Sequence, residues 1–162
     1  MGTEIERKFL VTGNSWHAPG VPETPIRQGY MAFGPPTAVR VRIAGEAATI
    51  NVKTATLAIR RHEFEYAIPI EDAEELLATC CAGHVIEKTR YAVGFSGAQW
   101  EVDVFSGVNA GLVVAEIELD REDEPFDLPP WAGAEVSHDP RYLNTHLSQR
   151  PFTEWQEFAD GL

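Results

Sequence analysis

The sequence predicts a mainly β protein with a few helices (an α+β fold), in which eight antiparallel strands close into a barrel around a polar lumen. Two observations lead to this prediction. In seven separate stretches, charged residues alternate with mostly apolar ones, and a period of two is typical of a β-strand, whose successive side chains point to opposite faces. Short turns rich in Gly and Pro separate several of these stretches, which favours antiparallel neighbours.

The strands are expected at eight places along the chain. Their ranges are 3–11, 26–33, 38–44, 47–54, 61–69, 85–94, 99–106 and 112–120. Turn signals follow the second, third, sixth and seventh of them, at Gly34-Pro35-Pro36, Gly45-Glu46, Ser96-Gly97 and Gly107 to Gly111. The last of these turns is not a phosphate-binding loop, because it lacks a Gly-Lys-Ser/Thr ending.

Three helices are expected, and their apolar surfaces suit them to covering the barrel from outside. The first spans 71–81 with Asp72 as its N-cap, and the second opens at Asp139-Pro140, an N-cap followed by proline at the first helical position. The third begins at Thr153 and packs Trp155 onto the body. We expect Trp100 and Trp131 to be core aromatics as well.

Composition limits the class of protein. The 162 residues fit one domain, expected over residues 1–162, with a sizeable core. The formal net charge of −12 argues against a surface for nucleic acid or for an anionic membrane. No apolar run approaches the ~20 residues that cross a bilayer. The charged amino terminus is unlike a secretory signal, so we expect a cytoplasmic protein.

The charged strand faces allow two arrangements. They could lie outside in solvent, as charged strand faces usually do, or they could line a wet tunnel inside the closed sheet. The distribution of charge favours the tunnel, because acids gather on the first, seventh and eighth strands and bases on the third and fourth. All three lysines are among the seven bases at alternating positions, which are Lys8, Arg40, Arg42, Lys53, Arg61, Lys88 and Arg90.

A dry interior would not tolerate these charges, because each buried ion costs several kcal/mol even after relaxation. The tunnel is therefore expected to hold water, metal ions and an anionic ligand. Arginine and lysine side chains are suited to phosphate oxygens, and carboxylates are suited to Mg²⁺ or Mn²⁺.

The motif Glu4-x-Glu6-x-Lys8 closely resembles the ExExK signature of the CYTH superfamily, also called triphosphate tunnel metalloenzymes. The motif alone is weak, but further elements of the family pattern follow it in order over nearly the whole chain. These are Arg40-x-Arg42, Lys53, 61–66, 88–91, 100–103 and 115–119. The chain looks most like the short bacterial members that hydrolyse inorganic tripolyphosphate. One departure concerns the fourth strand, where family members often have glycine after the lysine and this chain has Thr54 followed by residues 55–57.

The resemblance implies roles for twelve residues. Glu4, Glu6 and Lys8 would be catalytic. The bases that bind substrate would be Lys8, Arg40, Arg42, Lys53, Arg61, Lys88 and Arg90. The ligands of two divalent ions, Mg²⁺ or Mn²⁺, would be Glu4, Glu6, Asp103, Glu116 and Glu118.

The leading function is metal-dependent hydrolysis of inorganic tripolyphosphate, which could extend to nucleoside triphosphates. Two alternatives use the same tunnel on an organic triphosphate: cyclisation of ATP, as in class IV adenylyl cyclases, and hydrolysis of thiamine triphosphate. A third alternative is a non-catalytic module that binds polyphosphate or nucleotides. Outward apolar strand faces are compatible with a homodimer.

Overall fold

The computed structural model describes residues 2–54 and 58–155. Of the departure in the fourth strand, Thr54 is described and lines the cavity, whereas residues 55–57 lie outside the described part. The described strands are β1 (Gly2–Val11), β2 (Glu23–Ala32), β3 (Thr37–Ala44), β4 (Ala47–Thr54), β5 (Arg60–Ile68), β6 (Ala82–Phe95), β7 (Ala98–Ser106), β8 (Val113–Glu118) and β9 (Ala132–Glu135). The helices are α1 (Ile70–Thr79) and α2 (Asn144–Gln149), with 3₁₀ turns at Gly107–Asn109, Pro140–Tyr142 and Phe152–Glu154.

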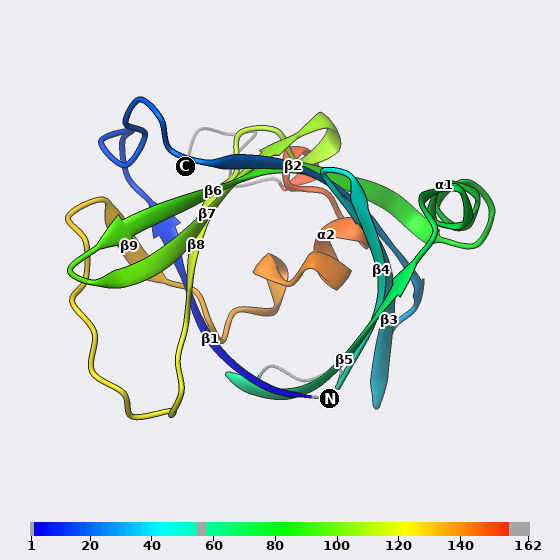
Figure 1. The fold of residues 1–162 in the computed structure, drawn as a ribbon, viewed down its shortest axis with the longest axis horizontal. Helices are drawn as coiled ribbons and strands as arrows, with labels where there is room; N and C mark the ends of the chain where they lie inside the picture. Colours follow the sequence, from blue (N-terminus) through cyan, green and yellow to red (C-terminus); the bar gives the residue numbers. More distant parts are fainter. Residues whose placement is uncertain (1, 55–57, 156–162) are drawn as a thin grey trace.

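Eight of the strands form a closed antiparallel ring. The order is β5-β4-β3-β2-β6-β7-β8-β1, and pairing of β5 with β1 closes it (Figure 1). This confirms the predicted eight-stranded barrel. A ninth strand, β9, was not predicted; it is four residues long and pairs with the second half of β1, as in Phe9 opposite Glu135. Such a short strand carries too few residues for an alternating pattern to be seen.

One helix lies outside the barrel and the other lies at its lumen. α1 packs Ala73 and Leu77 against Val41 and Ile43 of β3 on the outer face, as expected. Its N-cap is Pro69 and no side chain caps it, so the prediction of Asp72 as N-cap was wrong. Seen down the ring in Figure 1, α2 lies within the circle of strands. The prediction that all helices cover the barrel from outside was therefore wrong for α2.

The position of α2 follows from an apolar layer inside the barrel. Leu147 of α2 belongs to a buried cluster with Tyr142, Ile86, Phe105 and Val114. The three strand residues alternate in phase with charged positions of the same strands, so they point into the lumen. The lumen is thus apolar at one end, where the carboxy-terminal segment fills it, and charged along the rest.

The carboxy-terminal segment is held by specific contacts. Asp139 caps the turn Pro140–Tyr142 by accepting a hydrogen bond from the backbone nitrogen of Arg141, which confirms the predicted N-cap. The third helix expected from Thr153 is a short 3₁₀ turn, Phe152–Glu154, in the described part. Trp155 is buried as predicted, and its indole nitrogen donates to the Arg150 carbonyl.

A second aromatic cluster covers the barrel from outside. Trp100 of β7 is fully buried and makes edge-to-face contacts with Phe9, Phe126 and Trp131. These contacts hold the long segment after β8 against the outer face of β1 and β7, and they confirm both tryptophans as core residues. Among the described residues, no helix combines the length and the apolar character that crossing a membrane requires.

Candidate active site

A cavity of about 400 Å³ occupies the charged part of the lumen. Ten of the twelve predicted site residues line it: Glu4, Glu6, Lys8, Arg40, Arg42, Lys53, Arg61, Arg90, Glu116 and Glu118. The predicted inward arrangement of the charges is therefore what the structure has. Lys88 and Asp103 lie behind this wall, buried at 3% and 1% exposure.

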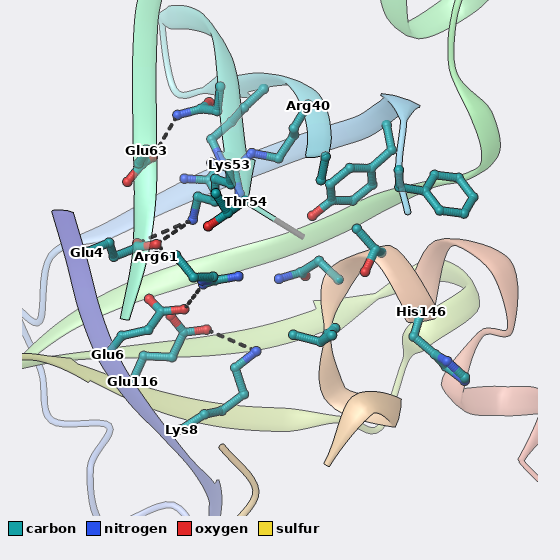
Figure 2. Close-up of a pocket in the computed structure, with 18 of the residues that line it drawn as sticks. Glu4, Glu6, Lys8, Arg40, Lys53, Thr54, Arg61, Glu63, Glu116 and His146 are labelled. Atoms are coloured by element: carbon teal, nitrogen blue, oxygen red, sulfur yellow. Dashed lines mark hydrogen bonds and ion pairs between the residues drawn. The ribbon is translucent and has the colours of Figure 1, made fainter. Parts of the chain in front are cut away.

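Strand register brings the acids of β1 against bases of β4 and β5. Glu4 is the cross-strand partner of Arg61, and its carboxylate lies 2.9 Å from Lys53 Nζ and 3.3 Å from Arg61 Nη2. Arg61 also donates to Glu6 at 2.6 Å (Figure 2). Burial raises the pKa of Glu4, but Lys53 and Arg61 outweigh it and hold the pKa below its usual value. Glu4 is therefore ionised at neutral pH.

Glu6 and Glu116 form a pair of neighbouring carboxyl groups. Burial, and then the charges of Glu116 and Glu4, raise the pKa of Glu6 to about 8. Burial also opposes the charge on Glu116, but Lys8, the nearby bases and a hydrogen bond from Glu6 hold its pKa well below the usual value. The pair thus shares one proton, which resides on Glu6, because two adjacent buried carboxylates do not both ionise without a compensating cation.

Lys8 connects this carboxyl pair to the carboxy-terminal segment. Its ammonium lies 3.5 Å from Glu116 Oε1 and donates a 3.0 Å hydrogen bond to the Tyr142 carbonyl. The segment that fills the apolar end of the lumen therefore also fixes a base of the cavity wall.

Arg40 and Arg42 differ from the other lumen bases. In the described part of the chain, neither forms an ion pair with a carboxylate, although Arg40 is only 6% exposed. Burial, followed by repulsion from Arg40 and Arg90, lowers the pKa of Arg42 to about 10. The two guanidinium groups therefore make a region of uncompensated positive charge, which suits a polyanion.

Asp103 anchors a buried network on β6 and β7. It accepts hydrogen bonds from Lys88 Nζ at 2.8 Å and from Arg90 Nε and Nη2 at 2.8 and 2.9 Å. Glu101 pairs with the other side of Arg90 at 2.7 Å. To bind a metal ion, Asp103 would have to release Lys88 and Arg90. Among the five residues predicted to bind metal, Asp103 would therefore need the largest rearrangement.

The carboxylates of the cavity fit hard divalent cations by their chemistry. Glu4, Glu6, Glu116 and Glu118 supply only oxygen donors, and a cation between Glu6 and Glu116 would replace the proton that they share. Within residues 2–54 and 58–155, no three acidic, His or Cys side chains are close enough together to hold a metal ion as they stand. Lys53, Arg61 and Lys8 engage three of these glutamates instead.

Sequence reasoning missed several residues of the cavity wall. Tyr30 and Asn51 line it. Asn51 is in phase with Lys53 on β4, so strand alternation could have found it, whereas the charged residues of β2, Glu23 and Arg27, have the opposite phase to Tyr30 and gave no such signal. Leu143, Asn144 and His146 also line it. No sequence signal pointed to these three, because their place depends on the carboxy-terminal segment folding back across the lumen.

Comparison with known proteins gives the family. The model of the CYTH domain matches residues 2–148. The chain belongs to the CYTH family. An inorganic triphosphatase of Acetivibrio thermocellus is 46% identical over 159 residues, which cover 97% of this chain and all of that protein. An inorganic triphosphatase of Nitrosomonas europaea is 37% identical over 155 residues, which cover 90% of this chain and 97% of that protein.

Solved structures support the CYTH fold. The crystal structure of an inorganic triphosphatase aligns with a TM-score of 0.67 at 35% identity, covering 91% of this chain and 95% of that one. A protein of Pyrococcus horikoshii, 19% identical, aligns with a TM-score of 0.56 over 74% of this chain and 81% of that one. The second likeness concerns the fold alone.

Proposed function

We propose that this CYTH protein is a metal-dependent hydrolase of inorganic tripolyphosphate. The observation that carries the proposal is a single cavity lined by a cluster of glutamates and by two arginines, Arg40 and Arg42, that have no carboxylate partner among the described residues. Carboxylates bind metal ions and arginines bind phosphate oxygens. A complex of metal ions with polyphosphate therefore matches both the glutamates and the arginines of the cavity. The names of the two relatives from Acetivibrio and Nitrosomonas support the same activity.

The residues of the cavity would bind the substrate, accept a proton and stabilise the transition state. Arg40, Arg42 and Lys53, together with Lys8, Arg61 and Arg90, would neutralise and orient the phosphate chain. Lys88, which lies behind the cavity wall and pairs with Asp103, would contribute its charge from there without touching the chain. Water attacks the terminal phosphorus, the bond from that phosphorus to the bridging oxygen breaks, and orthophosphate and pyrophosphate are released. Glu4, or Glu6 once it has lost the proton that it shares with Glu116, would accept the proton of the attacking water. Fixed positive charges then stabilise a transition state that needs little covalent help from the protein.

Family membership implies a divalent metal ion, and Mg²⁺ or Mn²⁺, with two ions bound, is our proposal for this chain. Glu4, Glu6, Glu116 and Glu118 would hold them, with Asp103 as a further ligand if it releases its bases. When bound, such ions neutralise phosphate charge and acidify water. The glutamates would then exchange Lys53, Arg61 and Lys8 for metal and free these bases for the substrate.

The remaining expectations stay predictions. They are a single domain over residues 1–162, a cytoplasmic location, the absence of nucleic-acid and membrane partners, and a homodimer. ATP cyclisation, thiamine triphosphate hydrolysis and binding without catalysis are the competing functions for the cavity.

One experiment separates these functions. Phosphate release is measured from tripolyphosphate, ATP and thiamine triphosphate, with Mg²⁺, with Mn²⁺ and with a chelator, and cyclic AMP is assayed in parallel. We expect release to be fastest from tripolyphosphate and to require metal. Faster turnover of an organic triphosphate, cyclic AMP as the product, or binding of tripolyphosphate without release would each overturn the proposal.

A further inference from the structure

A buried glutamine lies directly behind the arginines of the cavity. Gln28 of β2 is the cross-strand partner of Arg42 on β3 and of Ile86 on β6. It is in phase with Tyr30, which lines the cavity, and it is fully buried. A buried amide in a charged lumen needs a hydrogen-bond partner, since leaving one unsatisfied is costly.

Gln28 finds that partner in Arg42. The Nε–H of Arg42 donates to Gln28 Oε1 at 2.8 Å. A guanidinium group has five N–H donors, so this contact leaves the four on Nη1 and Nη2 for other acceptors. Arg42 lines the cavity, and with Nε engaged its two terminal nitrogens are the donors that remain for a ligand there, where a phosphate can accept from both.

The chemical identity of the partner matters because it is neutral. Lys8, Lys53, Arg61, Lys88 and Arg90 are all held by carboxylates, which cancel part of their charge. An amide oxygen orients Arg42 equally well without such cancellation. In the described part of the chain, Gln28 Nε2 has no hydrogen-bond partner, so the amide is not held by a competing contact.

We propose that Gln28 is a positioning residue for substrate binding, which fixes Arg42 in a phosphate-receiving orientation while leaving its full positive charge available. This inference rests on the proposed triphosphatase function and names a residue that the ExExK pattern and its associated motifs do not include. Gln28 acts through Arg42 and not by contact with the reacting atoms.

Gln28→Glu is the most informative variant, because it keeps the shape and the acceptor oxygen and adds only negative charge. We expect the KM for tripolyphosphate to rise about tenfold or more, the scale of one charge-assisted hydrogen bond, with kcat changed much less. Gln99→Glu makes the same chemical change at an exposed position of β7, and its KM should stay within about twofold of wild type. An unchanged KM in Gln28→Glu would overturn the need for a neutral partner. Because the added charge weakens anion binding by itself, the positioning of Arg42 is tested separately.

Dependence on Arg42 is tested by a double-mutant cycle. Gln28→Met removes the acceptor, and Arg42→Lys keeps the charge but has no Nε to be held. Each change alone should raise KM, and adding Gln28→Met to Arg42→Lys should raise it no further. Independent, multiplicative effects would overturn the inference. Arg42→Lys leaves Gln28 in place, so its KM can be compared even where Gln28→Met folds poorly.

Calorimetric titration with tripolyphosphate in a chelator separates failure of this inference from failure of the proposed function. Weaker binding by Gln28→Glu supports the inference even if the wild-type protein shows no hydrolysis with Mg²⁺ or Mn²⁺. Equal binding by Gln28→Glu and wild type overturns it, even if hydrolysis is fast.

Discussion

Lys88 Nζ and Asp103 Oδ2 lie 2.8 Å apart in an ion pair whose side chains are 0% and 1% exposed. Burial, the largest effect, lowers the pKa of Lys88 to about 7, although Asp103 acts in the opposite direction. Asp103 also holds Arg90, which does line the cavity. This pair therefore connects the barrel wall to the proposed substrate site.

Asp103→Asn tests whether the pair holds the barrel together. Removing one partner of a buried ion pair leaves an uncompensated charge, so the free energy of unfolding should fall by about 3–5 kcal/mol, measured by urea denaturation without metal. The matched control is Glu135→Gln, which breaks an exposed bidentate pair with Arg7 and should cost about 1 kcal/mol or less. A loss no larger than that of the control would show that Asp103 is not structural and would favour its role as a metal ligand.

Arg40→Met is expected to separate stability from binding. Arg40 is 6% exposed and has no carboxylate partner in the described chain, so an apolar side chain should raise the free energy of unfolding by roughly 0.5–2 kcal/mol. The rise in Tm that tripolyphosphate gives the wild-type protein should shrink, because an anion contact is lost. Arg27→Met, which breaks an exposed pair with Glu74, should change neither quantity appreciably. Destabilisation by Arg40→Met would contradict the idea of an uncompensated charge kept for a ligand.

The barrel was predictable because its signal is local. Each strand carries its own two-residue alternation, and the segregation of acids from bases indicated which face points inward. Glu4 and Arg61 therefore lie on the lumen face, as the pattern predicted, and their pairing across β1 and β5 comes from the structure. The alternation did not depend on knowing how distant segments meet.

The carboxy-terminal segment was not predictable for the opposite reason. α2 is six residues long, and its Leu147 is buried against side chains of β6, β7 and β8. The sequence pattern of an apolar helix face is the same whether the helix packs outside a barrel or inside one end of it, so the pattern does not distinguish the two positions. Gln28 was missed because an uncharged residue does not stand out in a pattern of charges, although its phase along β2 is that of the lumen.

Glu6 should make the stability of the metal-free protein depend on pH. Its pKa is about 8 in the folded chain, with Glu116, Glu4, Lys53 and Arg61 around it, against an ordinary value of 4.5. Between these values the folded state binds the extra proton, so the contribution of Glu6 to stability is present below pH 4.5 and is lost as pH rises towards 8.

The measurement is Tm in a chelator between pH 5 and pH 7 for wild type and Glu6→Gln. The amide cannot lose a proton, so the Tm of Glu6→Gln minus the Tm of wild type should increase as pH rises. Added Mn²⁺ should reduce the difference, because a cation would compensate the ionised pair. Parallel pH curves for the two proteins would show that Glu6 and Glu116 do not share a proton.

Glu118→Gln offers the cleanest test of the metal site. Glu118 lines the cavity opposite Glu6 in the β1–β8 register, and it forms no ion pair with another residue of the described chain. Replacing it removes the negative charge and one oxygen of a candidate carboxylate ligand without breaking a salt bridge, so the fold should keep its Tm. We expect the affinity for Mn²⁺, measured by calorimetry without substrate, to fall roughly tenfold or more, and the Mn²⁺ concentration for half-maximal hydrolysis to rise in parallel. Glu46→Gln, in the exposed β3–β4 turn, removes one negative charge away from the cavity and should change neither value. Unaltered Mn²⁺ affinity in Glu118→Gln would remove this residue from the ligand set and leave Glu4, Glu6 and Glu116 as its core.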